Sequence, residues 1–380
     1  MKTLMTLGLA AALMGGTAFA GPVKVGMITT LSGGGAGLGV DMRDGFALAL
    51  KLAGDDAADV TLITEDDQQK PDIGVQLADR MIQQDKVDVL AGIVFSNVAV
   101  AVVPAATAQG KFFLSANAGP SQLTGANCNP NYFSVSYQND NLHEGAGQAA
   151  MDLGYEKVFV MAPNYPAGTD AINGFRRFYT GDLAGEVYTQ LTQTDYAGEI
   201  AQIRDSGADA LFFFLPGGLG ISFMKQFAAS GVEVPIVGPA FSFSQDVLPA
   251  MGDAALGVQN ASTWSPDLDN PANAAFVEAF KAEFGRIPSI YAAQGFDTAN
   301  LIVSAAKVAD VADADAFRDA LRAADFASVR GKFSFGPDQH PVQDLYLREV
   351  VRDEDGTLTN RITMPLMTDH GNVFAADCTM

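Results

Sequence analysis

The feature that most constrains the fold of this chain is a regular alternation of short apolar, strand-like runs with longer segments of helical periodicity. In the first part of the chain, the strand-like runs cover residues 23–30, 60–67, 87–96 and 111–117. A strand–helix–strand order makes consecutive strands parallel and puts helices on both faces of their sheet. We therefore predict an α/β fold built on parallel sheets.

A second series of the same kind begins near residue 139. Its strand-like runs cover residues 157–163, 185–190, 208–216 and 234–240, with helical segments between them. Two such series predict two α/β lobes, because 380 residues exceed the usual size of one domain. The pattern becomes helical again after residue 265. Periodicity alone leaves open whether these late helices form a third domain or return to the first lobe.

Residues 1–20 have the composition of an export signal. Lys2 supplies a basic start, residues 4–14 are mostly apolar, and residues 18–20 (AFA) match the small-residue pattern before a cleavage site. A membrane anchor would need about 20 uninterrupted apolar residues, and this stretch is shorter. We therefore predict export to the periplasm with cleavage after Ala20, and we leave the signal out of the fold.

Charge and glycine patterns argue against nucleic acids and nucleotide cofactors as ligands. The formal net charge is −21 at pH 7, which disfavours contact with nucleic acid or anionic membrane surfaces. The Gly-rich run at residues 33–39 does not fit G-x-G-x-x-G in any register. A flexible rim beside a ligand site, at the end of a parallel strand, explains the run better. We expect no cofactor.

Residues that carry catalysis or bind metals are few. The three histidines, His143, His340 and His370, are scattered in polar or turn-like surroundings, and we expect them at the surface. No nucleophile–base signature is present, so we do not expect an enzyme. Cys128 and Cys378 predict a disulfide in an exported protein, and two buried thiols are the alternative. Because there is no Cys-x-x-Cys pattern or Cys/His cluster, we expect no metal site.

Neutral polar residues follow several of the predicted strands. Ser96 and Asn97 close one strand, Asn117 follows another, and Tyr165 follows a strand of the second series. Hydroxyl groups, together with backbone N–H groups at the start of a following helix, can bind a carboxylate without reacting with it. The recurrence of such residues in both series predicts a small-ligand site at these strand ends.

Five segments together resemble the periplasmic solute-binding proteins of ABC importers, of the branched-chain amino acid (Leu/Ile/Val-binding) type. They are VKVGMITTLSG, FFLSANAGPSQLTG, NYFSVSYQNDNLHEGAG, QTDYAGEIAQIRDSGADALFF and NPANAAFVEAFKAEFGRIPSIYAAQGFDTANLI. The resemblance covers essentially the whole mature chain. It implies two Rossmann-like lobes joined by a three-crossover hinge, with the solute held between them.

The resemblance also implies how the chain divides between the lobes. Lobe 1 is expected to contain residues 21–138 and 265–336, and lobe 2 residues 139–264 and 337–380. The crossovers are expected near residues 136–140, 262–266 and 334–340.

Site residues follow from the same resemblance. The family's carboxylate-binding serine falls on Ser96, next to Asn97, and its backbone-donating loop on Asn117, Ala118 and Gly119. The tyrosine that lines the cleft from the other lobe corresponds to Tyr165. Further residues of the cleft wall correspond to Leu215, Pro216 and Gly217. Three positions depart from the amino acid binders. Leu38 replaces a tyrosine, Gly119 a threonine, and Ala240 the acidic residue that meets the ligand ammonium.

The departure at Ala240, with Phe241 and Phe243 beside it, predicts a ligand that lacks an amine and has a flat or apolar body. Aromatic rings pack well against such a body, so we expect an aromatic or apolar carboxylate. A register shift that puts Gln245 or Asp246 in the acidic position would favour a branched-chain or other amino acid. The alternative is that both Phe side chains belong to the core.

The resemblance implies an ABC permease in the inner membrane as the partner, and we expect a monomer. A ligand-sensing receptor subunit would use the same fold. An exported α/β enzyme is the remaining, less favoured class.

Overall fold

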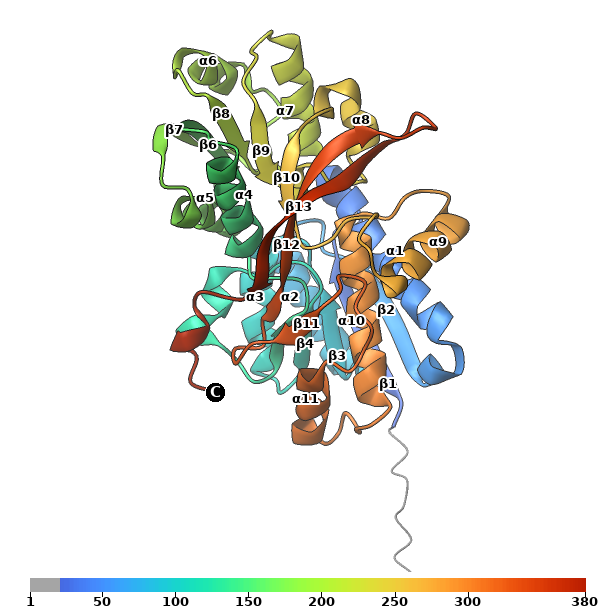
Figure 1. Cartoon of the computed structure of the whole chain (residues 1–380). Helices are drawn as coiled ribbons and strands as arrows, with labels where there is room; N and C mark the ends of the chain where they lie inside the picture. The colour runs from blue at the N-terminus through green and yellow to red at the C-terminus, as the bar shows by residue number, and fades with distance from the viewer. Residues whose placement is uncertain (1–20) are drawn as a thin grey trace, which may run out of the picture.

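The computed structural model describes residues 21–380, so the predicted signal at 1–20 lies outside the described residues. It contains two lobes, each built on its own sheet, as Figure 1 shows. None of the helices within residues 21–380 has the length and apolar character needed to cross a membrane.

The sheet of the first lobe has five parallel strands in the order β2-β1-β3-β4-β5. They are β1 (Val23–Thr29), β2 (Val60–Asp66), β3 (Val89–Gly92), β4 (Phe112–Ser115) and β5 (Tyr132–Ser134). Strands β3, β4 and β5 are buried along their whole length, as expected for a sheet covered on both faces.

Six helices belong with this sheet: α1 (Ala36–Ala53), α2 (Pro71–Arg80), α3 (Ser96–Thr107), α9 (Pro271–Phe284), α10 (Ile290–Ala306) and α11 (Ala314–Ala323). Helices α1 and α10 pack backbone against backbone through two glycines. A Cβ on Gly45 would lie 2.0 Å from the Ala292 carbonyl oxygen, and one on Gly295 would lie 2.0 Å from that of Met42. This contact brings the late helices back to the first lobe.

The sheet of the second lobe has the order β11-β12-β10-β9-β8-β6-β7, and β13 pairs with β12. Its strands are β6 (Lys157–Pro163), β7 (Asp182–Thr189), β8 (Ala210–Phe213), β9 (Ile236–Pro239), β10 (Gln259–Ser262), β11 (Phe333–Phe335), β12 (Pro341–Arg352) and β13 (Leu358–His370). Strands β6 to β10 pair in parallel, whereas β12 is antiparallel to β10, β11 and β13. The short turn between β12 and β13 permits only antiparallel pairing.

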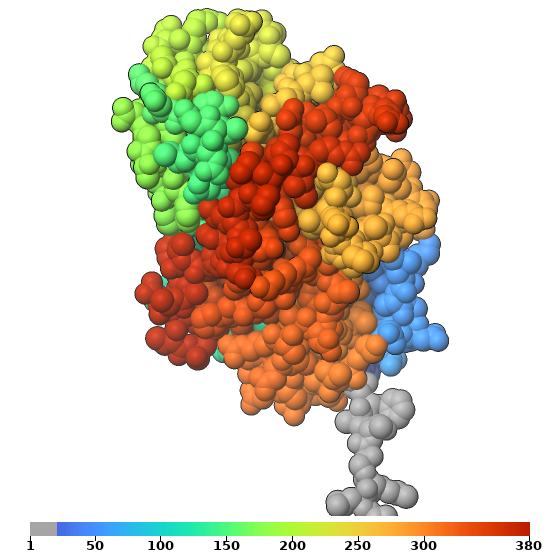
Figure 2. All heavy atoms as spheres, in the orientation of Figure 1, coloured from blue at the N-terminus to red at the C-terminus, as the bar shows by residue number. Residues whose placement is uncertain are grey.

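The helices of the second lobe are α4 (Asp140–Asp152), α5 (Pro166–Phe178), α6 (Ala197–Asp205), α7 (Gly218–Ala229) and α8 (Leu248–Met251). The chain passes between lobes after β5, after β10, and along β11 and β12. Figure 2 shows β12 and β13 lying across the junction of the two lobes. The residue boundaries of the lobes and of the crossovers stay a prediction.

Buried Arg330 fastens the first and third crossovers to α10. Its guanidinium pairs with Asp297 at 2.8 Å and donates to the carbonyl oxygens of Val135 and Ser136, each at 2.7 Å. The side chains of Arg330 and Asp297 are fully buried. Because a buried charge is costly without a partner, this network fixes the first crossover against α10.

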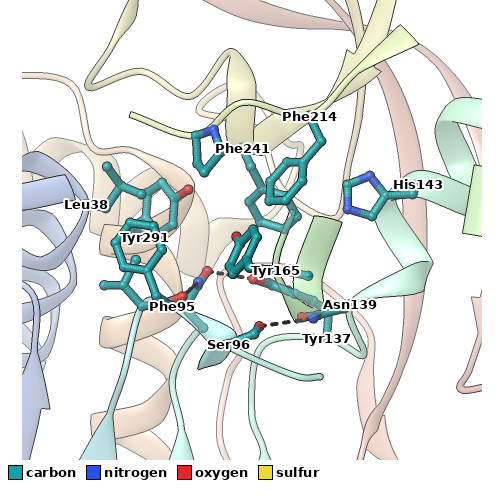
Figure 3. Close-up of a pocket in the computed structure, with 14 residues that line it drawn as sticks. Leu38, Phe95, Ser96, Tyr137, Asn139, His143, Tyr165, Phe214, Phe241 and Tyr291 are labelled. Carbon is teal, nitrogen blue, oxygen red and sulfur yellow. Dashed lines mark hydrogen bonds between the residues drawn. The ribbon is translucent and has the colours of Figure 1, made fainter. Parts of the chain in front are cut away.

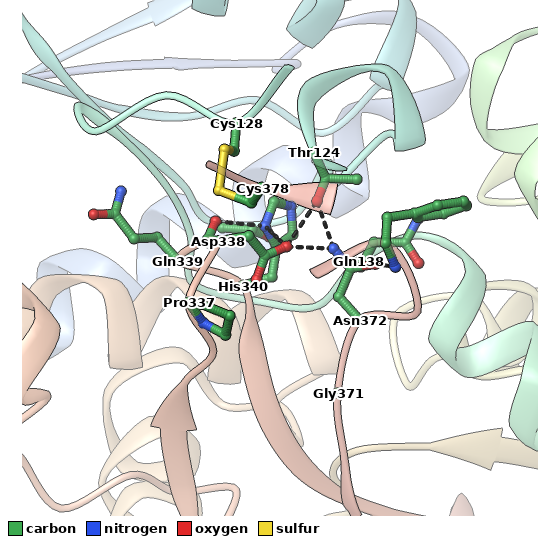
Figure 4. Close-up of polar contacts among 12 residues, drawn as sticks. Thr124, Cys128, Gln138, Pro337, Asp338, Gln339, His340, Gly371, Asn372 and Cys378 are labelled. Atoms are coloured by element: carbon green, nitrogen blue, oxygen red, sulfur yellow. Dashed lines mark hydrogen bonds and ion pairs between the residues drawn. A yellow bond between two sulfur atoms is a disulfide. The ribbon is translucent and has the colours of Figure 1, made fainter. Parts of the chain in front are cut away.

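The C-terminal residues contact the loop that precedes β5 of the first sheet. A disulfide joins Cys378 to Cys128, as predicted, with their Cα atoms 5.7 Å apart. Beside it, the Asp338 carboxylate accepts a hydrogen bond from the Thr124 hydroxyl at 2.7 Å and another from the Asn372 amide (Figure 4).

This cluster also corrects the prediction of a surface position for His340. The side chain is fully buried, and its Nδ1 atom lies 3.2 Å from Asp338 Oδ2. The polar neighbours that suggested exposure are the groups that satisfy one another inside the cluster. Hydrogen bonds from Thr124 and Asn372, together with His340, lower the pKa of Asp338 to about 2 against the opposing effect of burial.

Candidate ligand-binding site

A small cavity lies between the two lobes, with about 20 Å³ of room for the centre of a water-sized sphere. Figure 3 shows its lining side chains, which come from both lobes and from the first crossover. They are Leu38, Val94, Phe95, Ser96, Asn117, Tyr137, Asn139, His143, Tyr165, Ala167, Phe214, Pro216, Phe241 and Tyr291. Clefts at the carboxyl ends of parallel strands are where ligands bind in open α/β folds.

The first-lobe end of the cavity is formed by the start of α3. Phe95 is the N-cap residue, and no side chain caps the helix. The first amide N–H groups of a helix have no intrahelical acceptor, and the macrodipole places partial positive charge there. Ser96 adds a hydroxyl, whose oxygen accepts a hydrogen bond from Asn139 Nδ2 at 3.1 Å. This end therefore suits a small anion.

Asn117 and Tyr137 hold each other in the adjacent wall. Asn117 Nδ2 donates to the Val94 carbonyl oxygen, and the Tyr137 hydroxyl donates to Asn117 Oδ1, both at 2.8 Å. Burial raises the pKa of Tyr137 well above its ordinary value, so the phenol stays neutral. These bonds fix the orientation of the Asn117 side chain before any ligand enters.

Aromatic rings surround the rest of the cavity. Tyr165 and Phe214 lie nearly parallel, with an interplanar angle of 17° and centroids 6.3 Å apart. Phe241 lies 4.8 Å from the ring of Tyr137 and 6.3 Å from that of Tyr291, which comes from α10 of the first lobe. A flat apolar body between these rings would contact the edges and faces of several of them.

His143 is part of this wall and not a surface residue as predicted. Its side chain extends from α4 and packs edge-on against Phe214, with centroids 5.0 Å apart. Burial lowers the pKa of His143 to about 3, so the imidazole is neutral at physiological pH. His370, the third histidine, is only partly exposed and bonds through Nε2 to Glu144 at 2.5 Å.

None of the fourteen lining residues is Asp, Glu, Lys or Arg. The nearby carboxylates face other partners. Asp170 accepts hydrogen bonds from the Ser121 hydroxyl and from Asn139 Nδ2. Asp246 bonds to Ser244, and burial, with Asp41 as a further cause, raises its pKa to about 7. The cavity wall therefore offers no counter-charge for an ammonium group.

Six of the predicted ligand-binding residues line this cavity. They are Leu38, Ser96, Asn117, Tyr165, Pro216 and Phe241. The other predicted residues lie beside the cavity without lining it, and they are Asn97, Ala118, Gly119, Leu215, Gly217, Ala240 and Phe243.

Packing within the lobes explains why most of these seven residues do not line the cavity. Phe243 belongs to the core of the second lobe, edge-on to Phe213 with centroids 5.1 Å apart. Ala240, like Leu215, is fully buried. A Cβ at Gly119 would lie 2.1 Å from the Tyr137 carbonyl oxygen, so the close approach of the crossover requires glycine here. Gln245, the other register for Ala240, donates to the Leu358 carbonyl oxygen and also does not line the cavity.

Eight lining residues were not predicted. They are Val94, Phe95, Tyr137, Asn139, His143, Ala167, Phe214 and Tyr291. Phe214 continues an apolar strand, so its sequence context indicates a core residue. Tyr291 is far from the other site residues in the chain, so no local pattern connects it to them. Only the polar crossover sequence SYQND carried a usable signal for Tyr137 and Asn139.

A family model described as "Periplasmic binding protein" matches residues 22–357. This chain belongs to that family. The Leu/Ile/Val-binding protein homolog 6 of Brucella melitensis is 28% identical over 379 residues, covering 95% of this chain and 96% of the relative.

Solved structures extend the comparison to ligand complexes. A solute-binding protein of an ABC transporter from R. palustris, in complex with benzoate, is 30% identical with a TM-score of 0.89, covering 95% of this chain and 100% of that chain. One from Rhodopseudomonas palustris BisB5, in complex with 3,4-dihydroxybenzoic acid, is 31% identical with a TM-score of 0.83 (92% and 98% covered). The isoleucine complex of LivJ from Streptococcus pneumoniae, at 22% identity and a TM-score of 0.80 (90% and 100% covered), shares the fold.

The protein is therefore a periplasmic solute-binding protein of the ABC-importer type, with the two-lobed type I fold. Its family functions in transport and implies a small-molecule ligand and a membrane permease as partners.

Proposed function

We propose that this protein captures an aromatic or apolar carboxylate that lacks an amine, and delivers it to an ABC permease. The observation that carries the proposal is a cavity lined by aromatic side chains and by no charged residue. The protein acts as a monomer, and the ligand is released unchanged.

The uncharged wall disfavours an α-amino acid. An ammonium group enclosed without a counter-charge or a full set of acceptors costs several kcal/mol. Ser96 and the start of α3 can stabilise a carboxylate, but their positive potential does not help an ammonium. Phenylalanine and 3-phenylpropanoate share a ring and a carboxylate and differ only in the amine, so they test this point directly.

Benzoate-type acids fit the remaining features. The carboxylate is placed at Ser96 and the first amides of α3, and the ring lies among Tyr165, Phe214 and Phe241. The benzoate and dihydroxybenzoate complexes of the two R. palustris proteins support this choice, because these proteins are 30% and 31% identical to this chain over more than nine-tenths of its length.

Contacts across the cleft support hinge closure as the capture mechanism. The Ser121 hydroxyl, from the first lobe, donates to Asp170 of α5 in the second lobe at 2.6 Å. Asn139 donates both to Ser96 Oγ and to Asp170 Oδ2, the latter at 2.8 Å. A ligand that contacts both walls binds the closed form better and shifts the population towards it.

The test is isothermal titration of protein that has been unfolded, dialysed and refolded to remove bound solute. We expect benzoate and 3-phenylpropanoate to bind with a Kd on the order of micromolar, about −8 kcal/mol. Phenylalanine, leucine, isoleucine and valine should bind at least about a hundredfold more weakly, since the unpaired ammonium costs several kcal/mol. Benzyl alcohol, which lacks the carboxylate, is the matched negative control. Tighter binding of the amino acids would refute the proposal.

A further inference from the structure

His143 lines the cavity, and one of its ring nitrogens is buried without a hydrogen-bond partner among residues 21–380. The residue is 1% exposed, and this nitrogen is Nδ1. Its ring packs against Phe212, Phe214 and Phe241, at centroid distances of 5.9, 5.0 and 6.0 Å. A buried polar group without a partner costs about 1–3 kcal/mol, so an enclosed, unpaired imidazole needs an explanation.

We propose that His143 is the hydrogen-bond partner of a ring hydroxyl on the ligand, and that it selects para-hydroxylated aromatic carboxylates over unsubstituted ones. This inference rests on the proposed function and adds the substituent that the cavity recognises. A neutral imidazole has one donor and one acceptor nitrogen, which matches a phenolic hydroxyl that can both give and receive a hydrogen bond.

The position of His143 on α4 gives the place of the hydroxyl on the ring. Asn139, at the N-cap of this helix, contacts Ser96 at the end assigned to the carboxylate. His143 is four residues further along, so it lies on the same helix face, about 6 Å along the axis. A para-substituted benzene ring bridges this spacing between its carboxylate and its substituent. An ortho hydroxyl would stay beside Ser96, and a meta hydroxyl would point to the side wall.

The surroundings of His143 explain why the discrimination should be large. The rings of Phe214 and Phe241 lie beside the imidazole (Figure 3), and the His143 side chain is almost fully buried. A benzoate ring seals the cavity and leaves the imidazole unpaired, whereas a para hydroxyl satisfies it. A site built to hydrogen-bond a ligand group rejects analogues that lack the group.

The experiment measures the Kd of wild-type protein and of the variants His143→Leu and His143→Gln for benzoate and 4-hydroxybenzoate. We expect the wild type to prefer 4-hydroxybenzoate by about tenfold, the ratio that corresponds to one net hydrogen bond. His143→Leu, which keeps the volume but has no polar atom, should bring the ratio close to one. His143→Gln keeps a neutral donor and acceptor and should retain part of the preference.

Wild-type protein supplies a second measurement that does not depend on the folding of a variant. With ¹⁵N-labelled histidine, 4-hydroxybenzoate should shift the imidazole resonances of one of the three histidines, and benzoate should not. 3-Hydroxybenzoate, 2-hydroxybenzoate and 4-methylbenzoate serve as controls, and each should bind more weakly than 4-hydroxybenzoate.

The outcomes separate the two proposals. Equal wild-type affinity for benzoate and 4-hydroxybenzoate, or an unchanged preference in His143→Leu, would overturn the role of His143 while aromatic acid binding stands. Failure of every aromatic carboxylate to bind would overturn the proposed function, and this inference with it.

Discussion

Gly217 offers a direct test of whether ligand capture requires the cleft to close. Its backbone has φ +60° and ψ −133°, a conformation that residues with a Cβ rarely adopt. A Cβ at this position would lie 2.9 Å from both the Gly34 carbonyl oxygen and Leu38 Cδ1, which belong to the first lobe. Gly217→Ala therefore introduces backbone strain in every state and a steric clash only in the closed state.

The backbone strain and the steric clash affect different free energies, that of unfolding and that of cleft closure. The strained backbone should lower the free energy of unfolding by about 1–3 kcal/mol. The clash should add about 1–3 kcal/mol to the closed state alone, because overpacking by one methyl group displaces its neighbours. Since ligand binding is coupled to closure, the second term should weaken binding by roughly five- to 150-fold.

Gly252→Ala is the matched control. Gly252 has nearly the same backbone conformation, with φ +62° and ψ −147°, and lies in the same lobe. A Cβ there would have nothing within 4 Å. Both variants should lose similar stability in urea unfolding. Only Gly217→Ala should lose affinity in calorimetry and fail to become more compact in X-ray scattering on adding ligand. Equal affinities in the two variants would refute the closure argument.

Three further predictions concern the anion end, the C-terminal segment and pH. Ser96→Ala should weaken binding of an aromatic carboxylate by about 1–3 kcal/mol, measured by calorimetry, because a buried hydrogen-bond partner is lost; unchanged affinity would remove Ser96 from the site. Replacing both Cys128 and Cys378 by serine should lower the free energy of unfolding by about 2–4 kcal/mol, since the cross-link restricts the unfolded chain. Urea unfolding of the double variant against wild type measures this, and equal stability would contradict it. Burial lowers the pKa of His143 to about 3 in the folded protein, from about 6.5 when unfolded. The unfolded chain therefore binds more protons between these pH values, so stability should fall as pH drops below about 6.5, by up to about 1.4 kcal/mol per pH unit. His143→Gln should lose this part of the pH dependence in unfolding curves at a series of pH values, and an identical profile would show that His143 is not the group responsible.

Local sequence patterns predicted the architecture well, because they report directly on burial and periodicity. The apolar runs before residue 118 became four strands of the first sheet, and those between 157 and 240 became β6 to β9, four of the five parallel strands of the second. The return of the late helices to the first lobe was not readable from periodicity. It depends on Gly45 packing against Ala292 and on Gly295 packing against Met42 across α1 and α10, contacts between residues 247 and 253 positions apart in the chain.

The candidate site divides in the same way. Ser96 and Asn117 were found from sequence because strand ends followed by polar residues place donors at a known edge of a parallel sheet. Ala240 and Phe243, which the sequence also predicted, do not line the cavity. Each lies in buried surroundings, while Phe241 between them turns into the cavity.

The sequence by itself therefore determined the class of protein and the two α/β lobes, and it predicted the start of α3 as part of the site. Only the tertiary structure decided which rings line the cavity, that no charged side chain lines it, and that His143 is among the lining residues. The reason is physical. A strand or helix is specified by its own residues, but the chemistry of a cleft is set by which side chains from distant segments meet there, and that depends on packing across the whole molecule.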